Sequence, residues 1–373
     1  MPTELTNYQC PACTGPLRFD GATGKLVCDY CGSSYDVAQI EALYADKNEK
    51  AENAFNAKEE KDSTGDGWDI SDLGSGEWGV ADGMKQYNCP SCGAELICDE
   101  NTAATSCPYC GNPTVVPGQF SGMKKPDFVL PFKLSKEDAQ KALLEYYKGK
   151  KLLPGRFRSA SVVKEVKGVY VPFWMYDGTA EADILFEGVK NHIYRSGDYE
   201  VTRSDHFDVR RAGTVPFEKV PVNASSKMKD EYMDALEPFD YNELKAFSQA
   251  YLPGFLADKY DKEANEIADK ADQRVESTAV SVMRETVSGY DSVMMKGKSV
   301  RLRRGKVHYA LLPVYMLTVK WKDTDYLFAV NGRSAKTVGE LPVDKGRFWG
   351  YLCGIAAGLT AVITAVVYFL TAL

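Results

Sequence analysis

The sequence predicts an α+β protein: two tandem small ribbons built on cysteine pairs, an acidic linker, a strand-rich α+β domain and a C-terminal transmembrane helix. Three observations predict this architecture. Two sets of Cys-x-x-Cys pairs match, strand-like and helical segments mix between residues 126 and 342, and the last segment carries no charge. The length of 373 residues favours two or three domains, and 44% hydrophobic residues is enough for a sizeable core.

The two cysteine sets predict zinc ribbons over residues 1–38 and 87–117. In each set, fourteen residues separate two Cys-x-x-Cys pairs, and neighbouring proline and glycine suit turns that aim both sulfurs at one point. Two such turns make a closed tetrahedral site of four sulfurs, which selects Zn²⁺ and leaves no position for water. We therefore expect two structural zinc ions. Their ligands would be Cys10, Cys13, Cys28, Cys31, Cys89, Cys92, Cys107 and Cys110.

Two other uses of these cysteines stay open at this point. They could form disulfides, but Met1 to Tyr8 has neither a basic region nor an apolar run that would direct export. A cytosolic chain keeps its thiols reduced. A redox Cys-x-x-Cys pair is the second alternative, although redox chemistry does not require matched doubles. Cys98 has no sequence partner and is expected to be a small buried residue.

Residues 39–86 form an acidic linker, part helical and part flexible. Residues 41–86 contain twelve Asp or Glu and five Lys, a net charge of −7 that equals the net charge of the whole chain. Trp68 and Trp78 are the only large anchors in its second half. They could dock a partner or pack back onto a neighbouring domain.

The α+β domain is expected over residues 126–342. Ser135 and Asp138 form a capping box for a helix that Gly149 ends. Residues 169–176 and 182–189 read as strands joined by a turn at Asp177-Gly178, and residues 257–287 read as a long helix.

A quieter repeat lies inside this domain. The segment VPFWMY at 171–176 is similar to LPVYML at 312–317, and each precedes a further strand. We interpret the two as a duplicated β-unit. The alternative is that edge strands often begin with an apolar residue, a proline and an aromatic residue.

Residues 348–373 predict a single membrane-spanning helix. The 26 residues contain no charge and would extend about 39 Å, against a hydrocarbon core of about 30 Å. Lys345 and Arg347 precede the segment, so the positive-inside rule places residues 1–347 in the cytoplasm at the cell membrane. A buried core helix is the alternative. Three glycines share one face and would allow self-association or packing on a membrane partner: Gly350, Gly354 and Gly358.

The sequence contains no motif of an active site. Its three histidines, His192, His206 and His308, lie in strand-like segments without a neighbouring nucleophile or carboxylate pair. No phosphate-binding loop is present, which argues against an NTP-driven motor. We therefore expect no enzyme activity.

Taken together, the tandem ribbons, the stretch TAATSCPYCGNP, the stretch LLPVYML…YLFAVNGRSAKTVGELP and the tail helix resemble one family. It is the TFIIB-type zinc-ribbon, membrane-anchored family of Gram-positive bacteria, which resembles a component of a phage-shock-like envelope-stress operon. The resemblance implies recruitment of an SPFH-domain protein and a PspA-like protein to the membrane. The family turn Asn-Gly-x-Thr-Gly-Lys is replaced here at Ser334 and Ala335, which affects the expected turn geometry.

The charge of the ribbons discriminates between two classes of function. The first is a membrane-anchored adaptor or scaffold that recruits protein partners. The alternative is a zinc-ribbon protein that binds nucleic acid in transcription or replication. Residues 87–118 contain no Lys or Arg, whereas a nucleic-acid interface needs several cations to displace counterions. The charge favours the adaptor. Basic residues between Arg301 and Lys306 could face anionic lipid or be a solvated strand face. Partner identity, the signal sensed and the oligomeric state are not indicated by the sequence.

Overall fold

The structure is a computed structural model of the whole chain. It describes residues 10–12, 17–21, 23–28, 31–40, 42, 67–71, 73, 77–78, 84–99, 106–112, 116–118 and 123–372. Cys13 and most of the expected linker, including residues 43–62 of its helical part, lie outside the described residues.

A mixed sheet of eleven strands organises the described chain. Its longest members are β10 (Lys167–Ser196), β11 (Tyr199–Asn223) and β14 (Ser292–Trp321), with β10 between the other two in antiparallel pairing. The sheet path runs β12-β9-β14-β10-β13-β6-β5-β7, and β15 (Thr324–Asn331) and β16 (Thr337–Gly339) extend it from β14. The observed fold is therefore mixed α+β and rich in strands, as the sequence predicts.

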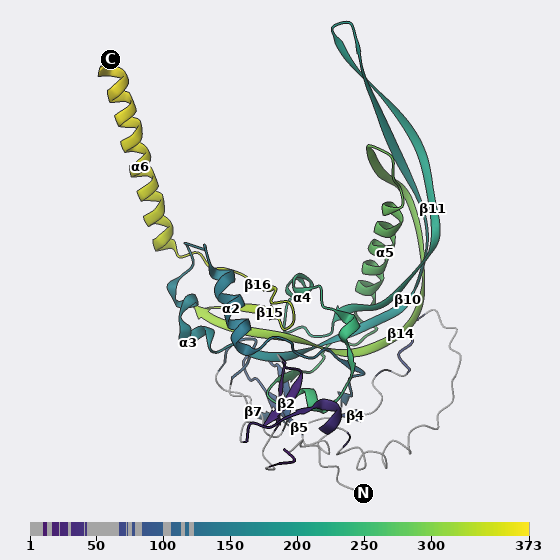
Figure 1. Cartoon of the computed structure of the whole chain (residues 1–373), viewed down its shortest axis with the longest axis vertical. Helices are drawn as coiled ribbons and strands as arrows, with labels where there is room; N and C mark the ends of the chain where they lie inside the picture. Colours follow the sequence, from purple (N-terminus) through teal and green to yellow (C-terminus); the bar gives the residue numbers. More distant parts are fainter. Residues whose placement is uncertain are drawn as a thin grey trace.

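One end of the three long strands leaves the body as a curved arm (Figure 1). Alternate residues of β10, from Ala180 to Phe186, are buried against α5 (Ala268–Glu285). The helix carries small and apolar residues four apart, at Ala271, Val275, Ala279 and Met283, which lie on one side of it. This side packs on the alternate strand residues that point to the same face of the sheet. From Lys190 to the end of β10 every side chain is exposed.

The predicted turn at Asp177-Gly178 is wrong. β10 continues through both residues, and its register with β11 and with β14 shifts between Tyr176 and Gly178. A β-bulge bends a strand without ending it, and Asp-Gly serves a bulge as readily as a hairpin turn. The long helix expected over 257–287 begins only at Ala268, because β13 (Leu256–Asp258) joins the sheet first.

The other end of the long strands forms the body, which α2 (Lys136–Tyr147) helps to cover. Its capping box is confirmed: Ser135 Oγ accepts from the Asp138 N–H at 3.2 Å, and the Asp138 carboxylate accepts from the Ser135 N–H. Aromatic rings dominate the core here, with Phe132 stacked on Phe255 at 4.1 Å. In this region Val171 pairs with Leu312, so the two similar segments lie side by side. The duplication itself stays a prediction.

The cysteine-rich segments contribute two sets of short strands. The first set, β1 (Leu17–Asp20), β2 (Lys25–Cys28) and β3 (Ser34–Asp36), forms its own sheet. The second set, β5 (Met84–Asn88), β6 (Glu95–Asp99) and β7 (Val116–Gly118), is part of the main sheet, because β6 pairs with β13.

The remaining elements are short, except for the last helix. They are β4 (Glu77–Trp78), β8 (Met123–Lys124), β9 (Phe128–Val129), β12 (Lys245–Ala246), α3 (Ala160–Val163), α4 (Asp230–Leu236), η2 (Gly155–Arg158), η3 (Tyr241–Glu243), η4 (Gln249–Tyr251) and α6 (Lys345–Ala372). From Lys345 to Tyr368, α6 is long and apolar enough to cross a membrane. Figure 1 shows α6 standing free of the body.

Candidate metal centres

Four sulfurs meet at the second cysteine set. The Sγ atoms of Cys89, Cys92, Cys107 and Cys110 all lie within 4.8 Å of one another. Cys89 and Cys110 are 3.6 Å apart, as are Cys92 and Cys107. A disulfide would bring two sulfurs to about 2.0 Å, whereas zinc bonds of about 2.3 Å in a tetrahedron separate sulfurs by about 3.8 Å. The arrangement fits a tetrahedral metal site.

Repeated backbone hydrogen bonds build this arrangement. Gly93 N–H donates to Cys89 O and Gly111 N–H donates to Cys107 O, at 2.9 and 3.1 Å. Both glycines have φ of +68°, a conformation that costs other residues energy, so the chain can turn back beneath each cysteine. Gly32 N–H donates to Cys28 O in the same way with φ of +71°. The shared pattern explains why three of the four pairs carry a glycine directly after the second cysteine.

The thiols of the second set differ in acidity. Burial raises the pKa of Cys89, but hydrogen bonds from the Cys92 and Ser91 N–H groups and from neighbouring thiols outweigh it and lower the pKa to about 7. Burial raises the pKa of Cys92 to about 11 and raises the pKa of Cys107 further. Gathering several buried thiolates at neutral pH therefore requires a cation among them.

The second cysteine set is fixed to the body by residues that lie between its cysteines. Tyr109, between two of the cysteines, donates to the buried Asp258 at 2.6 Å, and Ser225 donates to the same carboxylate at 2.6 Å. Thr318 Oγ1 donates to the carbonyls of Pro108 and Tyr109 at 2.8 and 2.7 Å. Burial raises the pKa of Asp258 to about 7. The site is therefore continuous with the sheet of the body.

Three sulfurs of the first set also converge. Cys10, Cys28 and Cys31 form a cluster, and Cys10 and Cys31 are 3.5 Å apart. The expected fourth ligand, Cys13, lies outside the described residues. Tyr35 contacts Cys10, with its hydroxyl 3.6 Å from Sγ, and Cys31 is exposed. Both clusters could hold zinc, because thiolate is the ligand that such borderline-soft ions prefer.

The remaining described cysteines lie apart from both clusters. Cys98 is buried in β6, as expected, and Cys353 is exposed on α6.

All three histidines lie on the long strands beside a carboxylate. His192 pairs with Asp205 at 3.4 Å, His206 with Glu187 at 3.3 Å, and His308 with Asp177 at 3.1 Å. The first two histidines are more than half exposed. The sequence did not indicate these pairs, because each carboxylate lies on a neighbouring strand or in the bulge.

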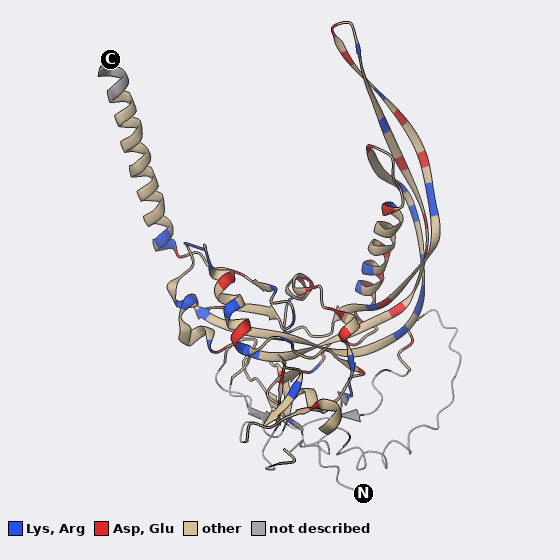
Figure 2. Ribbon diagram, viewed as in Figure 1, with Lys and Arg blue, Asp and Glu red and all other residues tan. Residues whose placement is uncertain are grey.

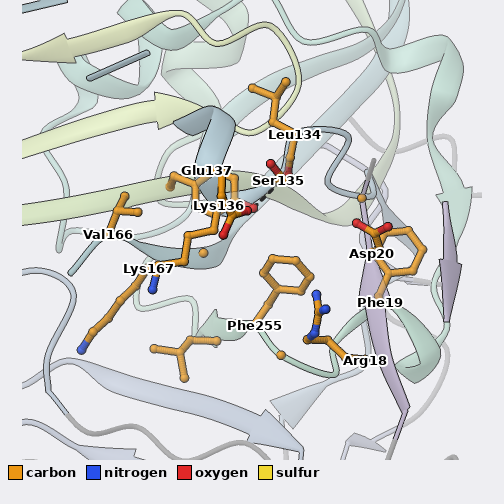
Figure 3. A pocket seen from close by; sticks show the side chains of 15 residues that line it. Arg18, Phe19, Asp20, Leu134, Ser135, Lys136, Glu137, Val166, Lys167 and Phe255 are labelled. Atoms are coloured by element: carbon orange, nitrogen blue, oxygen red, sulfur yellow. Dashed lines mark hydrogen bonds between the residues drawn. The ribbon is translucent and has the colours of Figure 1, made fainter. Parts of the chain in front are cut away.

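A cavity of about 570 Å³ lies between the first ribbon and the body, and the sequence did not predict it. Figure 3 shows Arg18 and Asp20 of β1 across from Ser135, Lys136 and Glu137 at the start of α2. The charged lining residues have both signs, so the cavity does not indicate one class of ligand. Its walls come from several distant segments, which explains the absence of a sequence signal.

The glycines singled out in the last helix leave one face open. A Cβ atom at Gly350, Gly354 or Gly358 would meet nothing within 4 Å in the described chain. Self-association through this face stays a prediction.

Comparisons with known proteins agree with the cysteine clusters. A family model described as Trm112p-like protein matches residues 9–39, which contain the first cysteine set. A Bacillus subtilis (strain 168) protein described as "Uncharacterized protein YdjG" is 34% identical over 354 residues, which cover 95% of both chains. No solved structure matches.

Proposed function

We propose a function for this chain on the premise that it belongs to the family of the Bacillus subtilis protein YdjG: it is a membrane-anchored scaffold that recruits protein partners. One observation supports this above the others. The same chain combines thiolate clusters suited to structural zinc with an apolar helix whose membrane-length stretch has no buried residue. Such a helix exposes apolar surface that water disfavours and a bilayer accepts.

The proposal places the body in the cytoplasm and both ribbons on zinc. Lys345 and Arg347 lie at the start of α6, and residues 348–373 carry no charge, so the positive-inside rule favours a cytoplasmic body. A reducing cytoplasm preserves the thiolates that zinc requires. The tandem ribbons would then be two structural sites.

The surfaces available to a partner follow from the fold. The second ribbon is joined to the main sheet through β6 and β13, whereas the first ribbon has its own sheet and the arm exposes two long edges. We assign recruitment to the first ribbon and the arm. The family resemblance suggests SPFH-domain and PspA-like proteins as partners in envelope stress.

The test is crosslinking and pull-down from native membranes, with nuclease treatment. Three proteins are compared: the full chain, a chain ending at Asp344, and Cys28→Ser in the first ribbon. We expect nuclease-resistant capture of defined proteins by the full chain, with the shortened chain recovered in the soluble fraction. Cys28→Ser should stay in the membrane and lose capture if the first ribbon docks the partner.

Two results would contradict the proposal, and a third would narrow it. Recovery of the full chain in the soluble fraction would remove the anchor. Capture that disappears with nuclease would support the nucleic-acid alternative. Unchanged capture by Cys28→Ser would move the docking surface to the arm.

A further inference from the structure

A basic segment lies at the foot of α6. Residues 148–164 contain six cations and no Asp or Glu. All six side chains are exposed, and they are Lys148, Lys150, Lys151, Arg156, Arg158 and Lys164.

Hydrogen bonds hold this segment against the first turn of the helix. Asp344 N–H donates to Leu152 O at 2.9 Å, and Arg347 Nη1 donates to Leu153 O at 2.9 Å. Asp344 also caps α6, accepting from the Gly346 N–H at 2.9 Å. The segment is therefore fixed where the apolar helix begins, and Figure 2 shows basic residues at the foot of α6 and on the adjoining turns.

Few of these cations are used inside the protein. Lys148 pairs with Glu145, and Arg158 donates to the carbonyls of Tyr147 and Lys150. Among the described residues, no carboxylate forms an ion pair with Lys150, Lys151, Arg156 or Lys164. Unpaired cations gathered on one surface attract an external anion.

The basic residues of the arm differ in this respect. Arg303 pairs with Glu181 at 2.5 Å, Arg304 with Asp272 at 2.7 Å and Lys298 with Glu276 at 2.6 Å. The lipid contact considered for residues 301–306 from the sequence is therefore less favoured, because acidic neighbours already compensate much of that charge.

We propose that residues 148–164, together with Lys345 and Arg347, form a basic collar that binds the anionic phospholipid headgroups around α6. The inference rests on the proposed anchor and extends it to lipid specificity. The collar lies at the helix end that meets the headgroups if α6 crosses the bilayer. Clusters of four to eight cations beside a membrane helix suit anionic headgroups.

The experiment uses the full chain in nanodiscs of phosphatidylcholine and phosphatidylglycerol at 7:3. Spin-labelled versions of the two lipids report, by electron paramagnetic resonance, which lipid is held next to the protein. We expect a several-fold preference for phosphatidylglycerol. The preference should weaken as salt rises from about 0.05 to about 0.5 M, because the Debye length is about 10 Å at 0.1 M and shortens with added salt.

The decisive variant is K150Q/K151Q/R156Q, which removes three unpaired collar cations. We expect this variant to lose most of the several-fold preference, because the removed cations are those left unpaired in the collar. The matched control, K296Q/K298Q/R303Q, removes three cations that are ion-paired on the arm. We expect it to keep the wild-type preference.

The possible results separate the collar from the anchor. Failure of the full chain to enter nanodiscs would overturn both. Incorporation without a phosphatidylglycerol preference would overturn the collar and leave the anchor intact. An equal loss in both triple variants would also overturn the collar, because total charge would then control the preference.

Discussion

At the scale of single residues, Asn331 builds the turn between β15 and β16. Its side chain is buried, donates to the carbonyls of Leu236 and Pro238, and accepts from the N–H groups of Arg333 and Ser334. These four bonds use the full capacity of the amide. The Asn331 side chain therefore fixes the turn by hydrogen bonds on both sides of the chain.

Ala335 adopts a left-handed backbone conformation, with φ of +62°. A Cβ atom makes this conformation unfavourable by roughly 1 kcal/mol. We expect Ala335→Gly to stabilise the protein by about 0.5 kcal/mol. The gain is smaller than the relieved strain, because glycine has more conformational entropy in the unfolded chain and this offsets part of it. Urea unfolding in detergent measures the change. The control Ala329→Gly, in the buried part of β15, should destabilise. A loss of stability in Ala335→Gly would contradict the strain.

The pair of His308 and Asp177 should make stability depend on pH. The hydrogen bond with Asp177 is the main cause that raises the pKa of His308, against burial. Burial raises the pKa of Asp177, but bonds from His308 and the Lys219 N–H outweigh it and lower the pKa. The histidine contribution is complete below its unfolded pKa of about 6.5 and is lost as pH rises through the folded value. The aspartate contribution is lost as pH falls below about 3.9.

The pair therefore stabilises most between about pH 4 and 6.5. We expect this pair to make the free energy of unfolding at pH 6 exceed that at pH 8 by roughly 1 kcal/mol. His308→Gln should remove that share of the difference, whereas His206→Gln, at a more exposed pair, should change it little. An unchanged pH profile in His308→Gln would exclude this origin.

At the scale of elements, the two cysteine clusters should differ in what their metal supports. Each closed site contributes on the order of 10 kcal/mol to folding. We expect Cys107→Ser to lose one equivalent of zinc and also the exchange protection of β13, because β6 pairs with that strand. Cys28→Ser should lose one equivalent and leave β13 protected. Zinc analysis and hydrogen exchange measure both effects; equal loss of protection would show that the sites are coupled.

The glycine face of α6 gives a second prediction at this scale. Gly354→Leu places a large side chain on the open face, so we expect weaker self-association in a membrane two-hybrid assay. Leu359→Ala changes an exposed residue outside the glycine series and serves as control. An unchanged signal in Gly354→Leu would dismiss the glycine face.

Local signals predicted several elements well and long-range pairing poorly. The capping box at Ser135 and the cysteine turns depend on residues three or four apart, which the sequence displays. The arm does not follow from such patterns, because nothing local separates a bulge at Asp177-Gly178 from a turn. The insertion of β6 beside β13 depends on a contact between segments about 160 residues apart, so it also has no local signal.

At the scale of the whole molecule, part of the expected linker is tied to the base of the arm. Asp69 N–H donates to Gly305 O, and Val307 N–H donates to Asp69 O, at 2.9 and 3.0 Å. Trp68 is buried with its ring 4.7 Å from that of Tyr176 and 6.2 Å from that of Phe217. Of the two readings open from the sequence, Trp68 packs back onto the domain. The side chain of Trp78 lies outside the described residues.

This contact predicts that the linker restrains the arm. Trp68→Ala removes a buried ring at the bulge, so we expect faster amide exchange over residues 178–188. Trp321→Ala, on the same sheet but packed near Phe157, is the matched control and should leave that region unchanged. Equal exchange in Trp68→Ala and the wild-type chain would show that the strands alone hold the arm.

The convergence of the described cysteines and the apolar terminal helix could be predicted from the sequence, because each depends on residue type and spacing. The basic segment at the foot of α6 could not, since about 190 residues separate it from the helix and the two meet through tertiary hydrogen bonds to Leu152 and Leu153. The ion pairs that compensate the charge of the arm could not be predicted either, because their partners lie on different elements.

The length of the arm sets the distance from the body at which a partner can be contacted. The 20 residues from Asp177 to Ser196 extend about 66 Å at 3.3 Å each, roughly twice the thickness of the hydrocarbon layer. Figure 2 shows charged residues along the strands of the arm, which disfavours its entry into the hydrocarbon layer. A partner that binds the tip of the arm would therefore be held far from the body.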